Sequence, residues 1–262
     1  MLLYDIKPAS LRVQNTSYFN FDNVHSSWHS CLNQALQKMD RVYLEHLQQK
    51  SWLPGPDKIF NAFSLPVEHV HYILLGESPY PRQASANGYA FWDAAVSELW
   101  SSTGMNKKVN RATSLRNMIK MLLVAESLIT PNTLTQEHIA CIDKSTLVKT
   151  NAELFHQFLL HGFLLLNASL VLQSSSKQKE AQEWNPFLKH VLLFLIKKRP
   201  NVTFLLLGKI ANTIQHHFFE CTLNIIQAEH PYNHSFITNS TVLQFFRPLH
   251  LLSPAKKTTF NV

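Results

Sequence analysis

Side chains that can bind polar ligands follow each of four short apolar runs in the sequence. Glu77 and Ser78 come after the first run, Asn167 after the second, Lys209 after the third and His230 after the fourth. A side-chain amide offers a donor and an acceptor in one plane, and a neutral imidazole has one donor and one acceptor nitrogen. Together, such groups could recognise a flat polar ligand and stabilise charge that develops on it during a reaction.

The four apolar runs are predicted to be buried strands of one sheet. They span residues 70–75, 163–166, 203–207 and 224–228, and none alternates cleanly between apolar and polar residues. This is typical of strands that are covered on both faces. Segments with helical periodicity lie between them, so the pattern predicts an α/β fold: a central, mostly parallel four-stranded sheet flanked by helices on both faces, in three α/β/α layers.

Two segments between the runs carry clear helix signals. Around residues 114–122, apolar residues recur at the spacing of one helix face: Leu115, Met118, Ile119 and Leu122. Further along, Asn185 and Pro186 suit the start of a helix, and the basic residues 197–199 before Pro200 suit its end. We expect this second helix to begin at residue 186.

The position of the polar turns indicates a shared site. In open α/β sheets, ligands bind outside the carboxyl ends of the strands. If the four runs are parallel strands, their turns converge at one edge and surround one cavity. The alternative is that every strand must end in some turn, whatever its function.

The turns, taken in order, resemble the motifs of family 1 uracil-DNA glycosylases. The family's GQDPYH is similar to GESPYP at 76–81, GLAF to GYAF at 88–91, SLxNIYKEL to SLRNMIKML at 114–122, LLLN to LLLN at 164–167, LLWGS to LLGK at 206–209 and HPSPLS to HPYNHS at 230–235. The resemblance covers roughly residues 28–251. It implies a DNA glycosylase that flips out uracil, or a related damaged base, and hydrolyses its N-glycosidic bond in base excision repair.

The resemblance implies a role for each residue of the base pocket. Asn167 would bind the O4 and N3–H edge of uracil, and Phe91 would stack on the flipped base. The ring of Tyr80 would exclude the methyl group of thymine. His230 would donate a hydrogen bond to O2 as the base leaves as an anion. An ordinary turn or core position remains the alternative for each of them.

The catalytic motif departs from the family pattern at three positions, where Glu77, Ser78 and Pro81 replace a glutamine, an aspartate and a histidine. Ser78 stands where the family has its catalytic aspartate, so a hydroxyl that can hold water replaces a charge that favours the cationic sugar. This predicts a slower enzyme, since a positioning group contributes about 10²–10⁴-fold. Glu77 replaces a glutamine and could hold the attacking water, or it could be a solvated carboxylate at a strand end.

Four further positions are predicted to contact DNA: Ser114, Gly208, Lys209 and His234. The pair Gly208-Lys209 replaces a glycine and a serine, so that a cation takes the place of a phosphate-binding hydroxyl. His234 stands where the family has the leucine that fills the gap left by the flipped base. Because an imidazole fills that gap less well, single strands are expected to be better substrates than duplexes.

The composition agrees with a nucleic-acid partner. Lys and Arg number 24 against 17 Asp and Glu, a net charge of +7 with a pI near 9.3, and this balance favours a polyanion such as DNA. Only three cysteines are present (Cys31, Cys141 and Cys221), which argues against a disulfide framework. Without a signal sequence or a membrane-length apolar run, we expect a cytoplasmic monomer that uses no cofactor or metal.

The predicted organisation is one domain with short extensions. Residues 1–24 would form an N-terminal extension, 25–252 the glycosylase-like domain and 253–262 a C-terminal tail. Two other functions stay open at this stage. Loss of the aspartate favours a catalytically inactive, glycosylase-like protein that binds DNA or a partner. The replacement of the family's glutamine by Glu77 could instead alter the hydrogen-bond pattern and direct the same hydrolysis to a base other than uracil.

Overall fold

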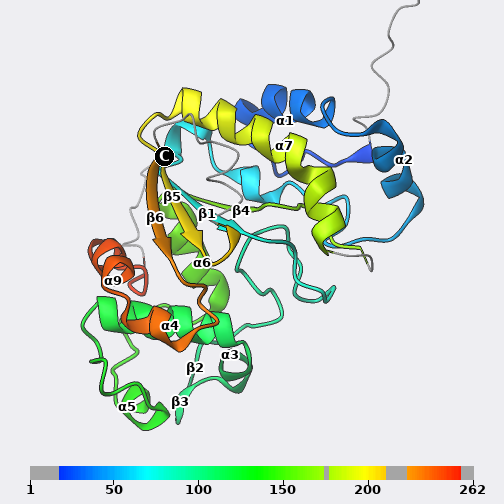
Figure 1. Cartoon of the computed structure of the whole chain (residues 1–262). Helices are drawn as coiled ribbons and strands as arrows, with labels where there is room; N and C mark the ends of the chain where they lie inside the picture. The colour runs from blue at the N-terminus through cyan, green and yellow to red at the C-terminus, as the bar shows by residue number, and fades with distance from the viewer. Residues whose placement is uncertain (1–17, 174–176, 211–222, 255–262) are drawn as a thin grey trace, which may run out of the picture.

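The computed structural model describes residues 18–173, 177–210 and 223–254. Its centre is a sheet of four parallel strands in the order β4-β1-β5-β6 (Figure 1). The strands are β1 (Tyr72–Gly76), β4 (Phe163–Asn167), β5 (Thr203–Leu207) and β6 (Asn224–Ala228). All four predicted strands are therefore confirmed. Because they are parallel, their carboxyl ends all lie at the same end of the sheet.

Helices cover both faces of this sheet, as predicted. One face packs against α1 (His29–Leu36) and α7 (Lys177–Lys198), and the other against α4 (Thr113–Ala125), α6 (Asn151–Leu160) and α9 (Ser240–Phe246). Alternate residues of each strand point to opposite faces. In β1, Ile73 and Leu75 join the first core and Leu74 the second, so the sheet separates two apolar cores.

Smaller elements complete the described part of the chain. They are α2 (Arg41–Gln49), α3 (Lys107–Arg111), α5 (Gln136–Ala140) and a short antiparallel pair, β2 (Trp100–Ser101) and β3 (Gly104–Met105). Five short 3₁₀ segments lie at Ser26–Trp28, Asn61–Ser64, Val67–His69, His234–Thr238 and Arg247–Leu249. The predicted helix around residues 114–122 is confirmed as α4, whose four predicted apolar positions are all buried.

The predicted start of the second helix is wrong. We expected it at residue 186, yet α7 begins at Lys177 and carries Pro186 in its interior. Proline lacks the N–H that would bond one turn back, but packing before it holds the helix together. Trp184 is fully buried and its indole N–H donates to the Tyr43 hydroxyl at 2.9 Å, and Glu180 accepts from the same hydroxyl. Tertiary contacts thus outweigh the local preference of the proline.

The ends of the chain and the cysteines add three observations. Phe19 and Val24, inside the predicted extension 1–24, are buried in the first core; residues 1–17 and 255–262 lie outside the described residues, and the domain limits stay a prediction. Cys31 is buried and Cys141 is exposed, both as free thiols, while Cys221 lies outside the described part. Among the described helices, none is both long and apolar enough to cross a membrane.

Candidate functional site

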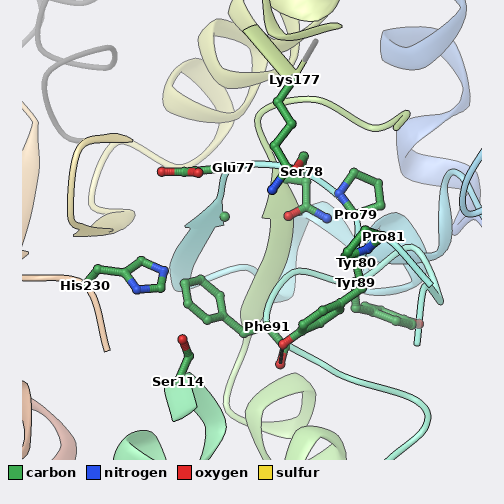
Figure 2. Close-up of a pocket in the computed structure, with 12 residues that line it drawn as sticks. Glu77, Ser78, Pro79, Tyr80, Pro81, Tyr89, Phe91, Ser114, Lys177 and His230 are labelled. Atoms are coloured by element: carbon green, nitrogen blue, oxygen red, sulfur yellow. Dashed lines mark hydrogen bonds between the residues drawn. The ribbon is translucent and has the colours of Figure 1, made fainter. Parts of the chain in front are cut away.

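A cavity of about 230 Å³ opens at the carboxyl ends of the strands. The turn after β1 supplies most of its wall, and segments distant in sequence complete it (Figure 2). Seven predicted site residues line it: Glu77, Ser78, Tyr80, Phe91, Ser114, Asn167 and His230. Figure 2 shows the rings of His230 and Phe91 and the hydroxyl of Ser114 directed toward the same space. Residues from the turns after β1, β4 and β6 therefore meet at one cavity, whereas the turn after β5 does not line it.

Asn167 presents an unpaired amide to this cavity. It ends β4, opposite Gly76 of β1, and only 4% of its surface is exposed. Its amide makes no side-chain hydrogen bond to any residue that the structure describes. A methyl group at Gly76 would lie 2.5 Å from the Asn167 Oδ1, so the glycine is what leaves room for the amide. Because Asn167 lines the cavity, its amide is available to hydrogen-bond a ligand there.

His230 is held in one tautomer by its own turn. The backbone N–H of Tyr232 donates to the His230 Nδ1 at 3.1 Å. The proton of the neutral ring is therefore on Nε2, which is free to donate. Burial lowers the pKa of His230 below its ordinary value, and the nearby charge of Glu77 opposes this shift only in part. The ring is thus a neutral donor at physiological pH.

Two neighbours fix the turn that carries His230. The amide of Asn117, buried in α4, donates to the carbonyl of Pro231 at 2.8 Å. On the other side, Gly208 approaches so closely that a methyl group there would lie 2.9 Å from the His230 Cβ. Gly208 also has φ +83°, a conformation in which glycine is strongly preferred. Gly208 can therefore pack against His230 only because it has no side chain.

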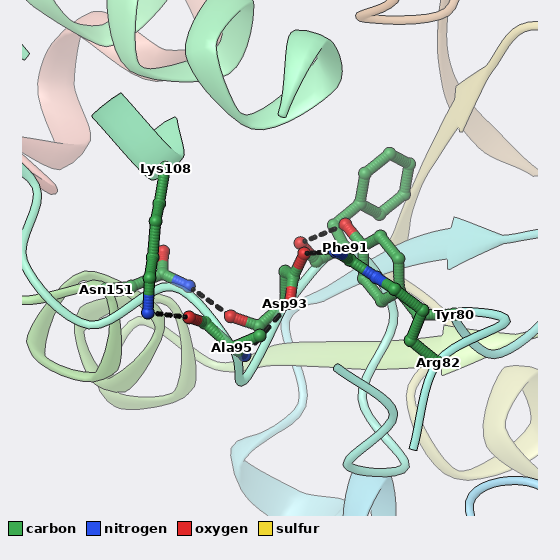
Figure 3. Close-up of polar contacts among 7 residues, drawn as sticks. All are labelled: Tyr80, Arg82, Phe91, Asp93, Ala95, Lys108 and Asn151. Atoms are coloured by element: carbon green, nitrogen blue, oxygen red, sulfur yellow. Dashed lines mark hydrogen bonds and ion pairs between the residues drawn. The ribbon is translucent and has the colours of Figure 1, made fainter. Parts of the chain in front are cut away.

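Phe91 and Tyr80 are positioned by a polar network in the loop that follows the first motif (Figure 3). The Tyr80 hydroxyl donates to the Phe91 carbonyl at 3.0 Å, and Phe91 adopts a left-handed backbone with φ 64°. Asp93, which is 2% exposed, accepts from Arg82 at 3.1 Å and from the N–H of Ala95 at 2.9 Å. Burial, reinforced by the charge of Asp93, raises the pKa of Tyr80, so its hydroxyl stays protonated.

A second polar contact and a ring contact complete the loop. The Asn151 amide donates to the Asp93 carbonyl at 2.9 Å, tying the loop to the start of α6. Phe91 faces the imidazole of His230, with ring centroids 5.9 Å apart and planes inclined by 28°. The loop thus places one aromatic face at the cavity, next to the imidazole.

The turn after β1 carries Glu77 and Ser78, two of the three departures from the family motif. Its backbone is fixed, because the Gly76 and Glu77 carbonyls accept from the N–H groups of Ala168 and Ser169 at 2.8 and 3.0 Å. Ser78 is half-buried and the Glu77 side chain is exposed. Figure 2 shows the Glu77 carboxylate extending from this turn on the side of the cavity where His230 lies.

Sequence reasoning assigned no role to Lys177 or Tyr89, and it did not predict the hydrogen bond from Asn117 to Pro231. Lys177 lines the cavity from the first turn of α7, and Figure 2 shows its side chain directed toward Ser78. It was missed because the helix was expected to start nine residues later. Tyr89 lies within the GYAF match and lines the cavity beside Phe91. Asn117 lies within the α4 match, but its contact with Pro231 depends on how distant segments pack.

The remaining predicted residues do not line this cavity. Lys209 lines a second cavity that shares Glu77, Ser78 and Lys177 with the first. Gly208 contacts His230, as described above. His234 is exposed at the start of a 3₁₀ segment. No group of three His, Cys, Asp or Glu side chains in the described residues could hold a metal ion.

The geometry can bind a flat ring that carries both donors and acceptors. The Asn167 amide offers one of each, the Nε2–H of His230 offers a donor, and Phe91 offers an aromatic face. The donor of His230 is fixed before any ligand arrives, which is the arrangement that stabilises an anion as it forms. The site is thus built for a polar heterocycle.

Comparison with known proteins agrees with this geometry, although no family model matches the chain. A uracil-DNA glycosylase from Borreliella burgdorferi is 24% identical over 219 residues, which span 79% of this chain and 83% of that protein. The crystal structure of mimivirus uracil-DNA glycosylase, at 16% identity and a TM-score of 0.56, covers 82% of this chain and 72% of that one and shares the fold.

A further solved structure is more similar. The UNG crystal structure from Nitratifractor salsuginis is 37% identical, with a TM-score of 0.83, and the match covers 88% of this chain and 94% of that one. The sheet, the order of the motifs and this identity over nearly the full length of both chains lead to one assignment. The chain belongs to the uracil-DNA glycosylase superfamily.

Proposed function

We propose that this protein removes uracil from DNA by hydrolysing the bond between the base and the deoxyribose. The observation that carries the proposal is the buried amide of Asn167, which faces the cavity without a hydrogen bond to the described residues. Uracil offers an acceptor at O4 and a donor at N3, the complement of a side-chain amide. The base must first leave the helix stack, which costs a few kcal/mol.

Recognition of the base rests on three side chains. Asn167 binds the O4 and N3–H edge, and Phe91 stacks on the ring. Tyr80 lies beside Phe91, to which its hydroxyl is bonded, and its ring crowds the position where thymine carries a methyl group. The network around Asp93 keeps both rings in place, so thymine is excluded by a rigid wall.

Departure of the base is assisted by His230. Breaking the glycosidic bond leaves negative charge on the base, and the Nε2–H of His230 donates to O2 as that charge develops. Because the Tyr232 N–H fixes the tautomer, no reorientation is needed during the reaction. Removing a donor of this kind costs about 10²–10³-fold in rate.

The attacking water is held by the turn after β1. The Ser78 hydroxyl binds the water, and the Glu77 carboxylate provides the negative charge that favours the cationic sugar. Since Glu77 is exposed, its charge is partly screened by solvent. We therefore expect slower hydrolysis than an aspartate at position 78 would give.

The test uses labelled single-stranded and duplex oligonucleotides that carry one uracil, hypoxanthine or xanthine. After incubation with the protein, alkali cleaves the strand wherever a base has been removed. Cleavage at uracil that is lost in Asn167→Ala and greatly reduced in Glu77→Gln supports the proposal. Cleavage only at hypoxanthine or xanthine would instead assign the protein to another base.

A catalytically inactive DNA-binding protein is the second candidate, and Ser78 is the observation that favours it. The Ser78→Asp variant separates the two. If the wild type is slow because of the missing charge, this variant excises uracil about 10²-fold faster. If the wild type cleaves no substrate but binds DNA in a salt-sensitive way, the protein is a binding protein.

We infer that Ser114, Lys209 and His234 contact DNA next to the base pocket. Ser114 lines the cavity, Lys209 lines the neighbouring cavity and His234 is exposed close to His230 in sequence. A hydroxyl, a cation and an imidazole are all suited to contacts with the DNA backbone. The monomeric state and the cytoplasmic location stay predictions of the sequence.

A further inference from the structure

A second cavity of about 390 Å³ adjoins the base pocket. The two share Glu77, Ser78 and Lys177 as common wall. Beyond this wall, the second cavity extends along the first half of α7 and reaches the turn after β5, where it ends at Lys209 and Ile210. The proposed reaction uses none of this space.

The lining of the second cavity combines amides, apolar side chains and cations. Three amides come from one side of α7: Gln178, Gln182 and Asn185. None of them makes a side-chain hydrogen bond within the described part of the chain. Leu188 and Ile210 add apolar surface, and Lys177 and Lys209 are the two cations. Amides bind the polar edges of bases and lysines bind phosphate, so this combination suits a nucleotide.

Lys177 lies where the two cavities meet. If two consecutive nucleotides occupied the two cavities, the phosphodiester that joins them would lie beside the residues that both cavities share. Lys177 supplies a cation there, and Figure 2 shows it directed toward Ser78, whereas the Glu77 carboxylate extends away on the side of His230. The negative charge of Glu77 therefore lies apart from the lysine at the junction.

We propose that the second cavity binds the nucleotide next to the target base, with Gln182 and Asn185 contacting its base and Lys177 its phosphate. The inference rests on the proposed function for the position of the target base. A neighbouring base can enter the cavity only when it is unpaired and unstacked. The second cavity therefore makes the protein selective for single-stranded DNA and sensitive to the base beside the target.

The test measures binding and does not require excision. The probe is a fluorescein-labelled single-stranded pentanucleotide of thymidines with a central 2′-fluoro-2′-deoxyuridine, whose fluorine disfavours the cationic sugar and so prevents hydrolysis. In two further probes, the thymidine on either the 5′ or the 3′ side of the target is replaced by a tetrahydrofuran spacer, which keeps the phosphate and removes the base. Affinities are measured by fluorescence anisotropy.

We expect the spacer on one side to weaken binding about tenfold, within the range for loss of one bound base, and the spacer on the other side to change it less than about twofold. In the double variant Gln182→Ala/Asn185→Ala, the tenfold difference falls to about twofold, whereas Gln37→Ala, at a residue after α1 that lines neither cavity, retains it. Lys177→Gln weakens binding to all three probes equally and reduces its salt dependence. Lys179 lies on the same helix but lines neither cavity, so Lys179→Gln leaves both the affinity and its salt dependence unchanged.

Two results would overturn the inference. One is equal affinity of the wild type for all three probes, and the other is a neighbour effect that survives in the Gln182→Ala/Asn185→Ala variant. Excision of uracil is assayed separately on the same protein. Excision without a neighbour effect would reject the second nucleotide site and support the proposed function. A neighbour effect without excision would support the second site and reject the proposed function.

Discussion

At the scale of single residues, His230 has only one ring nitrogen available to a ligand. Its Nδ1 accepts a hydrogen bond from the Tyr232 N–H. A second proton would bind to Nδ1, point at that N–H and abolish the hydrogen bond that holds the turn. Burial places the pKa of the ring below its ordinary value. The ring is therefore neutral above about pH 6.5 and becomes charged only as the pH falls below that value.

The first prediction concerns pH. Single-turnover excision of uracil by the wild type should be constant from about pH 8 to pH 6.5 and decline below it, as the His230 ring gains its second proton. His230→Gln should be slower by about 10²–10³-fold and should lack this acid decline. An unchanged acid limb in the variant would assign the decline to another group.

The second prediction concerns the backbone of Phe91. With φ 64°, any residue with a Cβ is strained there by about 1–2 kcal/mol. Phe91→Gly should therefore be more stable than Phe91→Ala by about 1 kcal/mol in urea denaturation, although glycine ordinarily destabilises relative to alanine. Both variants should lose affinity for uracil, because both lack the ring. A less stable glycine variant would show that the position is not strained.

At the scale of elements, the register of β1 and β4 decides how the amide is exposed to the ligand. Gly76 lies opposite Asn167, and no side chain fits between them. The position of the Asn167 amide thus depends on Gly76 in the neighbouring strand, one residue before the turn that carries Glu77 and Ser78.

The third prediction tests this register. Gly76→Ala should displace the Asn167 amide and reduce uracil excision by about 10²-fold, comparable to losing a well-placed polar contact, while the fold persists in circular dichroism. Gly55→Ala is the matched control, because a methyl group there has no atom within 4 Å. The control should keep its activity, although its backbone, with φ +94°, costs some stability.

Most of the site could be predicted from the sequence because its residues follow strands that are apolar and short. The strands at 163–167 and 203–207 are unambiguous, so Asn167 and the turn at Gly208 follow directly from them. The start of α7 could not be predicted. It depends on the burial of Trp184 against distant segments, and with it Lys177 and the second cavity were missed.

At the scale of the whole molecule, the net positive charge favours a polyanionic partner. The chain carries +7 overall, and Lys177 and Lys209 lie at the carboxyl ends of the strands, beside the two cavities. If these lysines bind phosphates as we propose, long-range attraction of DNA and local binding of its phosphates act at the same face.

The fourth prediction is a change in salt dependence. Lys209→Ser restores the residue type that the family motif has at this position, and it should reduce the slope of log affinity against log salt by about one for single-stranded DNA. Lys197→Ser removes a lysine from the far end of α7 and should leave the slope unchanged. Equal slopes for Lys209→Ser and the wild type would show that Lys209 contacts no phosphate.

The order of the strands has a consequence for how the two halves of the site are held apart. Asn167 belongs to β4 and His230 follows β6, the two outermost strands of the sheet, so three ladders of about 4.8 Å each separate them. Each ladder also adds its own rotation. The separation of amide and imidazole is therefore a property of the entire sheet, and buried side chains such as Leu74 and Leu205 help to define it although they never meet the DNA.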